Sequence, residues 1–164
     1  MDQNSTQLDR WTEIAKHCFM TVSSSALGLE PAPQDEAQRP DHGVCGSVLS
    51  LSSEQNTTCV GLSSTADGCR RLAGAMLGMD AAELESLSPE DVQDSIGELV
   101  NILAGALKTA LAAEDGALSL GLPLFIEGAW GPIRRTQGRH VEFSVGEVPC
   151  VLSLLVGTHH PRAA

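Results

Sequence analysis

The sequence contains no tyrosine, and aromatic residues make up only 3% of its 164 positions. A protein that binds single-stranded nucleic acid by stacking bases needs a platform of aromatic side chains, which this composition does not supply. Basic residues are also scarce: 10 lysines and arginines stand against 21 acidic residues, for a formal net charge of −11. Because phosphate backbones and anionic membrane surfaces attract clustered lysine and arginine, we expect neither as a main partner.

Long apolar runs are missing as well. No stretch reaches the roughly 18 uninterrupted apolar residues of a membrane helix, and the start of the chain lacks the basic and apolar segments of a signal peptide. We therefore expect a cytoplasmic protein without membrane insertion. Apolar residues make up 42% of the chain, enough for a core, and the length predicts one domain. We place it at residues 9–157, between a flexible N-terminus (1–8) and a flexible tail (158–164).

The five cysteines do not form a recognisable framework. Their number is odd and no pair has CxxC spacing, so neither a set of disulfides nor a zinc site is indicated, and small buried side chains are the simplest interpretation. His17 beside Cys18 and the pair His159-His160 could bind metal adventitiously, but we expect no functional metal site and no cofactor on this chain. Phosphate-binding glycine loops and the GxSxG nucleophile elbow are absent.

The first half of the chain contains two predicted helices around a hairpin. Apolar residues at steps of three and four predict a helix from about Leu8 to Leu27. Residues 28–43 hold three prolines and little apolar content, so we expect a long loop. Residues 46–51 and 57–62 are predicted to pair as a hairpin, followed by a helix over 66–77 that ends at Gly78.

The clearest helix start is Ser88-Pro89-Glu90-Asp91. Serine is a good N-cap, proline suits the first helical position, and Asp91 completes an acidic variant of the capping box. We expect this helix to run from about Pro89 to Ala113 and to end near Gly116.

Three strand candidates follow, at 117–127, 140–145 and 149–156. The basic residues around the turn before the second candidate (Arg134, Arg135, Arg139 and His140) are interpreted as a solvated loop, or alternatively as a contact to a partner's phosphate or acidic groups. No parallel βαβ alternation runs through the chain. The order of elements predicts an α+β fold in which helices cover an antiparallel sheet.

The helix predicted over 89–113 has two faces. Apolar side chains at steps of four, three and four form a stripe that requires a core: Ile96, Val100, Leu103 and Leu107. A polar stripe lies roughly opposite: Asp94, Glu98, Asn101, Gly105 and Lys108. The second stripe is either a solvated face or a binding face. Gly97 and Gly105 each cost the helix about 0.5–1 kcal/mol relative to alanine, which indicates close approach by another part of the domain or by another protein.

Residues 94–108, which read DSIGELVNILAGALK, resemble the signature helix of the CheX-like chemotaxis phosphatases, which belong with the CheC and FliY proteins. That signature is Asp-x-x-Gly-Glu-x-x-Asn followed by a Gly and a Lys. The surrounding elements match in order as well: the first helix, the hairpin, the helix ending at Gly78, and Leu-Gly-Leu-Pro at 120–123. The resemblance covers about Trp11 to Gly157. Three positions on or near the core side depart from the common signature, and we expect them to change packing and not activity: Ser95, Val100 and Leu107.

The resemblance implies a fold in which two long helices plus a shorter helix cover one side of an antiparallel sheet. It also implies that the chain removes the phosphoryl group from the aspartyl-phosphate of a CheY-like response regulator, by inserting this helix into the receiver active site. Mg²⁺ would belong to the partner. In the first helix Lys16 stands where a second asparagine would follow Glu13, so the chain is CheX-like with one site, and such proteins are typically homodimers.

Residue chemistry suggests a role for each polar side chain. A carboxamide can both donate and accept hydrogen bonds without a charge that repels phosphate, so Asn101 suits the positioning of an attacking water. Glu98 is expected to pair with the receiver's lysine. Asp94, Gly105 and Lys108 are assigned to partner binding, Gly105 by admitting the regulator closely, and Asp94 and Lys108 as rim or structural residues.

A net charge of −11 does not steer the chain toward an acidic receiver pocket, so any attraction must be local. A second function also fits the sequence: a non-catalytic scaffold, or a sensor of the phosphorylation state, that has kept the docking helix. Such a binder has no use for Asn101 as a water-positioning group.

Overall fold

The computed structural model of the chain describes residues 3–33, 44–54, 56–128, 130–132 and 136–158. Its elements follow in the order α1 (Gln3–Val22), the π-helix η1 (Ser23–Leu27), β1 (Pro31–Pro33), β2 (Val44–Ser52), β3 (Asn56–Thr65), α2 (Ala66–Leu77), the 3₁₀-helix η2 (Glu83–Ser86), α3 (Pro89–Asp115), β4 (Ser119–Leu120), β5 (Leu124–Glu127), β6 (Thr136–Val145) and β7 (Val148–Thr158).

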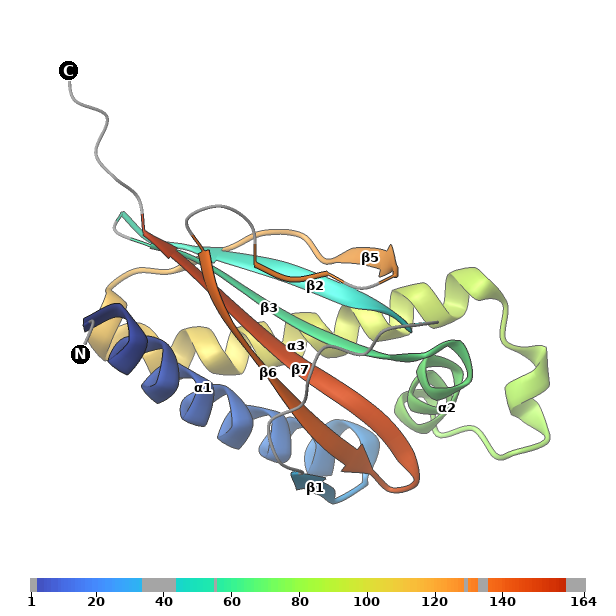
Figure 1. The fold of residues 1–164 in the computed structure, drawn as a ribbon. Helices are drawn as coiled ribbons and strands as arrows, with labels where there is room; N and C mark the ends of the chain where they lie inside the picture. The colour runs from blue at the N-terminus through green and yellow to red at the C-terminus, as the bar shows by residue number, and fades with distance from the viewer. Residues whose placement is uncertain (1–2, 34–43, 55, 129, 133–135, 159–164) are drawn as a thin grey trace.

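All the strands belong to one antiparallel sheet. Its order is β1-β6-β7-β3-β2-β4, with β5 also paired to β2. The long helices α1 and α3 lie across one face of this sheet and contact each other, and α2 packs near one end of the same face (Figure 1). The α+β fold with two long helices and a shorter one on an antiparallel sheet is confirmed.

The core lies between the helices and the sheet. Alternate side chains of the central strands point toward the helices and are buried, among them Leu49, Leu51, Val60, Leu62, Leu152 and Leu154. From α1 the ring of Phe19 meets Phe143 of β6 edge-on, with centroids 4.8 Å apart. The predicted apolar stripe of α3 is confirmed, because Ile96, Val100, Leu103 and Leu107 are all buried.

The local signals at the helix ends are confirmed. The Oγ of Ser88 accepts from the Asp91 N–H and the Asp91 carboxylate accepts from the Ser88 N–H, both at 3.1 Å, which completes the capping box of α3. The Ser88 hydroxyl also donates to the Asp91 carboxylate at 2.7 Å, and this bond, together with the one from the Ser88 N–H, holds the pKa of Asp91 below its usual value. For α2, Thr65 caps the N-terminus and Gly78 ends the helix at a φ of +69°, a backbone conformation that glycine adopts without strain.

The predicted hairpin of 46–51 and 57–62 is present with longer strands, in β2 and β3. The first helix begins earlier than predicted. Residues 3–8, expected to belong to a flexible N-terminus, are the first turns of α1, and Leu8 is fully buried beside the core. Tertiary burial extends the helix here, which periodicity inside the helix does not predict.

The loop predicted over 28–43 contains a short strand. Pro31–Pro33 pairs with β6, at the edge of the sheet where prolines are tolerated; residues 34–43 lie outside the described residues. The predicted strand 117–127 is wrong as a single element, since it divides into β4 and β5 around Gly121-Leu122-Pro123. There the Gly121 N–H donates to Ser50 O at 2.7 Å, and Pro123 has no N–H to continue the ladder.

The last two strands extend further than predicted, as β6 and β7, and the strand β7 includes Thr158, which had been placed in the flexible tail. The rest of that tail, with His159-His160, lies outside the described residues. All five cysteines are free, as expected: Cys18, Cys69 and Cys150 are buried and Cys45 and Cys59 half-buried. Burial raises the pKa of the Cys150 thiol to about 12.

The helix α3 is long and apolar enough to cross a membrane by length and composition alone. In the structure its apolar side packs against the sheet and α1. Its other side carries charged side chains such as Asp94, Glu98 and Lys108, which are exposed. We therefore assign α3 as the core helix of the domain.

Candidate functional site

The polar stripe of α3 faces away from the core. Asp94, Glu98 and Lys108 are exposed, and Asn101 and Gly105 are half-buried. The amide nitrogen of Asn101 lies 3.5 Å from Oε2 of Glu98, so the structure brings these two predicted site residues together. No salt bridge among the described residues involves Glu98 or Asp94. The carboxylate of Glu98 thus stands beside a carboxamide, with its charge uncompensated.

The C-terminal end of α3 is fixed by three polar contacts. Glu114 accepts from the Trp11 indole N–H at 3.0 Å and pairs with Arg10 at 2.6 Å, which ties α3 to α1. The next residue, Asp115, is buried and accepts from the side-chain amide of Asn56 at 2.9 Å, which ties α3 to β3. These contacts join the C-terminal end of α3 to α1 and to β3.

The N-terminal end of α3 is fixed as well. The guanidinium of Arg70 in α2 donates to the carbonyls of Leu84 and Leu87, at 3.1 and 2.7 Å, and so holds the segment that leads into the capping box. A helix held at both ends presents its exposed side chains in a defined geometry, as a binding or catalytic site requires.

The two helical glycines have different surroundings. A Cβ on Gly97 would stand 3.6 Å from the ring of Pro123, at ordinary contact distance. A Cβ on Gly105 would meet no atom within 4 Å in the described part of the chain. Internal packing therefore does not require glycine at 105, and the missing side chain leaves an open place on the exposed face.

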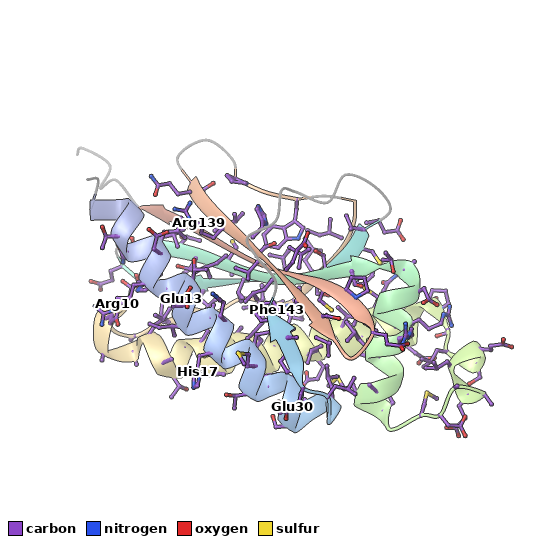
Figure 2. All side chains as sticks on the ribbon, turned by 60° about the horizontal axis from the view of Figure 1, so that its bottom comes forward. Arg10, Glu13, His17, Glu30, Arg139 and Phe143 are labelled. Carbon is purple, nitrogen blue, oxygen red and sulfur yellow. The ribbon has the colours of Figure 1, made fainter. Side chains whose placement is uncertain are left out.

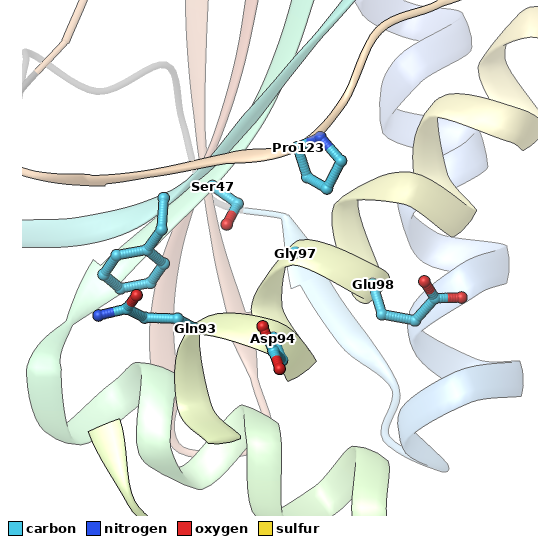
Figure 3. A pocket seen from close by; sticks show the side chains of 7 residues that line it. Ser47, Gln93, Asp94, Gly97, Glu98 and Pro123 are labelled. Atoms are coloured by element: carbon cyan, nitrogen blue, oxygen red, sulfur yellow. The ribbon is translucent and has the colours of Figure 1, made fainter. Parts of the chain in front are cut away.

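A pocket of about 530 Å³ lies beside this face, between α3, β2 and the segment that enters β5 (Figure 3). We call it the α3–β5 pocket. It is lined by Ser47, Gln93, Asp94, Gly97, Glu98, Pro123 and Phe125. The sequence identified only the α3 carboxylates and Gly97 as notable, because nothing in the local pattern shows that Ser47 and Phe125, paired across β2 and β5, come to lie next to them.

The described residues of the predicted basic cluster, Arg139 and His140, lie in β6 and contact α1 and β7. Arg139 pairs with Asp9 of α1 at 2.8 Å, beside the first turns of that helix (Figure 2). The Nδ1 atom of His140 lies 2.7 Å from the Ser153 hydroxyl in β7. Arg134 and Arg135 lie outside the described residues. Within the described ranges no group of three or more histidine, cysteine or acidic side chains could hold a metal, and His17 and Cys18 belong to no such group.

The family described as chemotaxis phosphatase CheX matches residues 47–144. This range is more than half of the chain and includes the whole of α3. The chain belongs to the CheX family. The resemblance that residues 94–108 indicated is therefore confirmed, and the phosphatase class is established at the level of the family.

Solved structures of chemotaxis proteins share the fold. The chain is similar to a CheX from Vibrio vulnificus, with 19% identity, a TM-score of 0.70, and 89% of this chain and 95% of that chain covered. A CheX from Desulfovibrio desulfuricans gives 15% identity, a TM-score of 0.71, and coverage of 92% and 99%. A CheX from Borrelia burgdorferi, solved as a CheX–CheY–BeF₃–Mg²⁺ complex, has 17% identity and a TM-score of 0.67, with 90% of this chain and 97% of that chain covered. No curated protein sequence matches the chain.

Proposed function

We propose that this CheX-family chain hydrolyses the aspartyl-phosphate of a CheY-like response regulator, with α3 inserted into the receiver active site. One observation carries the proposal: Glu98, free of any salt bridge among the described residues, stands next to Asn101 on the exposed side of a helix that is anchored at both ends. The relative from Borrelia burgdorferi, which is bound to CheY with BeF₃ and Mg²⁺, supports this choice of partner.

Asn101 is proposed to position the attacking water. Phosphoryl transfer gains most of its acceleration from positioning and from stabilisation of charge. A carboxamide can accept a hydrogen bond from the water and donate one to a phosphoryl oxygen without bringing a negative charge near the phosphate. The water oxygen attacks phosphorus, the P–O bond to the aspartate breaks, and the products are inorganic phosphate and the free carboxylate. No nucleophile on this chain is needed.

Glu98 is proposed to anchor the complex. A carboxylate next to a phosphoryl group is repelled unless a cation lies between them, and the lysine of the receiver active site is such a cation. Because no side chain of the described residues neutralises Glu98, its full charge remains for that lysine. Gly105 would admit the receiver's backbone, and Asp94 and Lys108 would contact it at the rim.

The remaining expectations belong to the same proposal. The Mg²⁺ ion is held by the receiver, and this chain supplies no cofactor of its own. The protein acts in the cytoplasm, where response regulators are found, and we expect a homodimer. Light scattering of the purified chain tests the dimer, since a mass near the 17.2 kDa of one chain would contradict it.

The proposed function is tested by following the decay of phosphorylated stand-alone receivers from the same genome, with and without the protein. One receiver is expected to lose its phosphate faster with the wild type and at its spontaneous rate with Asn101→Ala. Glu98→Ala is expected to weaken binding of the same receiver activated with beryllofluoride. Acceleration by Asn101→Ala equal to that by the wild type would contradict the mechanism.

A non-catalytic scaffold or phosphorylation sensor is the second candidate, and it rests on the same open face of α3. It predicts binding of an activated receiver without faster decay of any receiver, and no effect of Asn101→Ala. The family match to phosphatases and the presence of Asn101 next to Glu98 favour the enzyme.

A further inference from the structure

The α3–β5 pocket shares Glu98 with the pair that the proposed mechanism uses, and its other six lining residues lie outside that pair. Its far wall comes from β2 and from the segment entering β5, while Asp94 and Glu98 stand at its α3 edge (Figure 3). We propose that this pocket receives one arginine or lysine side chain from the surface of the receiver domain. The proposal rests on the proposed function, and it adds a second point of recognition next to the reacting centre.

The charge of the pocket selects a cation. Two of its seven lining residues are carboxylates, Asp94 and Glu98, and none is basic. Among the described residues, Asp94 takes part in no salt bridge. A guanidinium or ammonium group in the pocket would gain a charge-assisted hydrogen bond to Asp94, which is stronger than a neutral one, while Glu98 pairs with the receiver's active-site lysine.

Ser47 provides an independent indication of a ligand. Its side chain is 1% exposed, and its hydroxyl has no hydrogen-bond partner within the described structure. In Figure 3 the oxygen points away from the strand into the space facing Gly97. Buried hydroxyls are normally satisfied, because an unmade hydrogen bond in the interior is destabilising. An N–H donor reaching into the pocket would supply the missing partner.

The walls and the opening fit a long basic side chain. Pro123 and Phe125 offer apolar surface for the methylene stem, and an aromatic ring also attracts a cation placed over its face. Gly97 keeps the space open: a Cβ there would stand 3.6 Å from Pro123 and 4.0 Å from the Ser47 oxygen, inside the pocket and without a clash. Alanine at 97 therefore narrows the pocket while leaving the helix intact.

The test uses the full chain and the receiver whose decay it accelerates, trapped with beryllofluoride and Mg²⁺ for calorimetric measurement of Kd. Gly97→Ala and Asp94→Asn are each expected to raise Kd by about tenfold, and Gly97→Ala is expected to leave the decay rate at saturating protein unchanged. Glu90→Gln removes the same charge from an exposed residue of α3 outside the pocket and is the matched control, with Kd unchanged. Gly97→Ala is also expected to raise Tm, since alanine favours helix, so weaker binding cannot come from unfolding.

A double-mutant cycle identifies the occupant. Each surface lysine and arginine of the receiver is replaced by glutamine and measured against the wild-type chain and against Asp94→Asn. Apart from the active-site lysine that pairs with Glu98, one receiver residue is expected to lower the affinity for the wild-type chain when it is replaced and to leave the affinity for Asp94→Asn unchanged. Wild-type Kd for both Gly97→Ala and Asp94→Asn would overturn the pocket proposal, whereas a wild-type decay rate for Asn101→Ala would overturn the proposed mechanism and leave the pocket standing.

A receiver-independent measurement covers the case in which no receiver is accelerated. Methylguanidinium chloride is titrated into the ¹⁵N-labelled chain, with tetramethylammonium chloride as the control. The backbone amide resonances of Ser47, Gly97 and Phe125 are expected to change chemical shift with methylguanidinium and not with tetramethylammonium. In Asp94→Asn these chemical-shift changes are expected to disappear. Shifts spread over all surface carboxylates, or equal shifts with both salts, would contradict the pocket proposal.

Discussion

The helices α1 and α3 carry the same polar spacing with opposite outcomes. In α1, Lys16 follows Glu13 by three residues, and its ammonium lies 2.8 Å from the Glu13 carboxylate on the outer surface of the helix (Figure 2). In α3, Asn101 follows Glu98 by three residues, and its amide nitrogen is 3.5 Å away. The first pair cancels its charge internally. The second pair leaves a full negative charge beside a neutral carboxamide.

The difference extends along both helices. Four residues before the glutamate, α1 has Asp9, which Arg139 neutralises, whereas α3 has Asp94, which is in no salt bridge among the described residues. Seven residues after the glutamate, α1 has the exposed side chain of Met20, whereas α3 has Gly105 with open space around it. The carboxylates on this face of α1 are paired within the domain, whereas Asp94 and Glu98 on α3 form no salt bridge among the described residues.

The change with the largest expected effect makes α3 resemble α1. In Asn101→Lys the new ammonium pairs with Glu98 as Lys16 pairs with Glu13, so the water-positioning group and the free carboxylate are lost together. We expect the decay rate of the phosphorylated receiver to fall by about 100-fold, and the Kd for the activated receiver to rise. Ala110→Lys adds the same charge to an exposed position of α3 away from the polar stripe and is the control. Retention of the wild-type rate by Asn101→Lys would mean that this pair is not the reacting centre.

The next change fills the open place on α3. Gly105→Met puts the side chain of Met20 at the matching position and is expected to weaken receiver binding by about tenfold. It is also expected to stabilise the fold by about 0.7–1 kcal/mol, because methionine favours helix more than glycine does. Calorimetry measures the affinity for the receiver, and urea denaturation measures the free energy of unfolding. A variant that is more stable and binds equally well would show that the receiver does not approach Gly105.

A smaller effect concerns the start of α3, where the capping box fixes the first turn. Ser88→Ala removes the cap and is expected to lower the free energy of unfolding by about 1 kcal/mol at neutral pH. The pKa of Asp91 is lowered in the folded state, so its contribution is present above its unfolded pKa and lost as the pH falls through the folded value. The difference in free energy of unfolding between Ser88→Ala and the wild type should therefore become smaller at acidic pH. Urea titrations at pH 7 and at acidic pH measure it, and a constant difference would contradict the linkage.

The smallest expected effect is in α1. Lys16→Asn restores the Glu-x-x-Asn pattern in this helix, but Arg139 still neutralises Asp9 and Met20 still covers the matching surface. In an Asn101→Ala background we therefore expect no recovery of receiver dephosphorylation. Faster decay in the double variant than in Asn101→Ala alone would show that the glutamate and asparagine suffice without the surrounding open face.

Much of α3 could be predicted from the sequence because its signals are local. Its cap, its end at Gly116 and its buried stripe depend on residues within a few turns of one another, and all three are confirmed. The division of residues 117–127 into β4 and β5 could not be predicted. It depends on the hydrogen bond from Gly121 to Ser50, seventy-one positions earlier in the chain, and on Pro123 interrupting the ladder.

The candidate site also has a part that the local sequence predicts and a part that only the tertiary structure shows. The pair of Glu98 and Asn101 is visible in the sequence because a helix places positions three apart on one side. The contribution of Ser47 to the α3–β5 pocket is invisible there, since it arises from strand pairing between β2 and β5 and from the packing of α3 on that edge. Likewise the contacts that Trp11 and Arg10 of α1 make with Glu114 of α3 join residues more than one hundred positions apart, which no local pattern predicts.

The central claim is that the open face of α3, and not the matching face of α1, acts on the receiver. It is tested most directly by the crystal structure of this chain bound to its receiver, trapped with beryllofluoride and Mg²⁺. We predict that the carboxamide of Asn101 lies about 3 Å from a water in line with the beryllium and that Glu98 pairs with the receiver lysine. A complex in which the receiver contacts another surface, with Glu98 and Asn101 still exposed to solvent, would contradict the account.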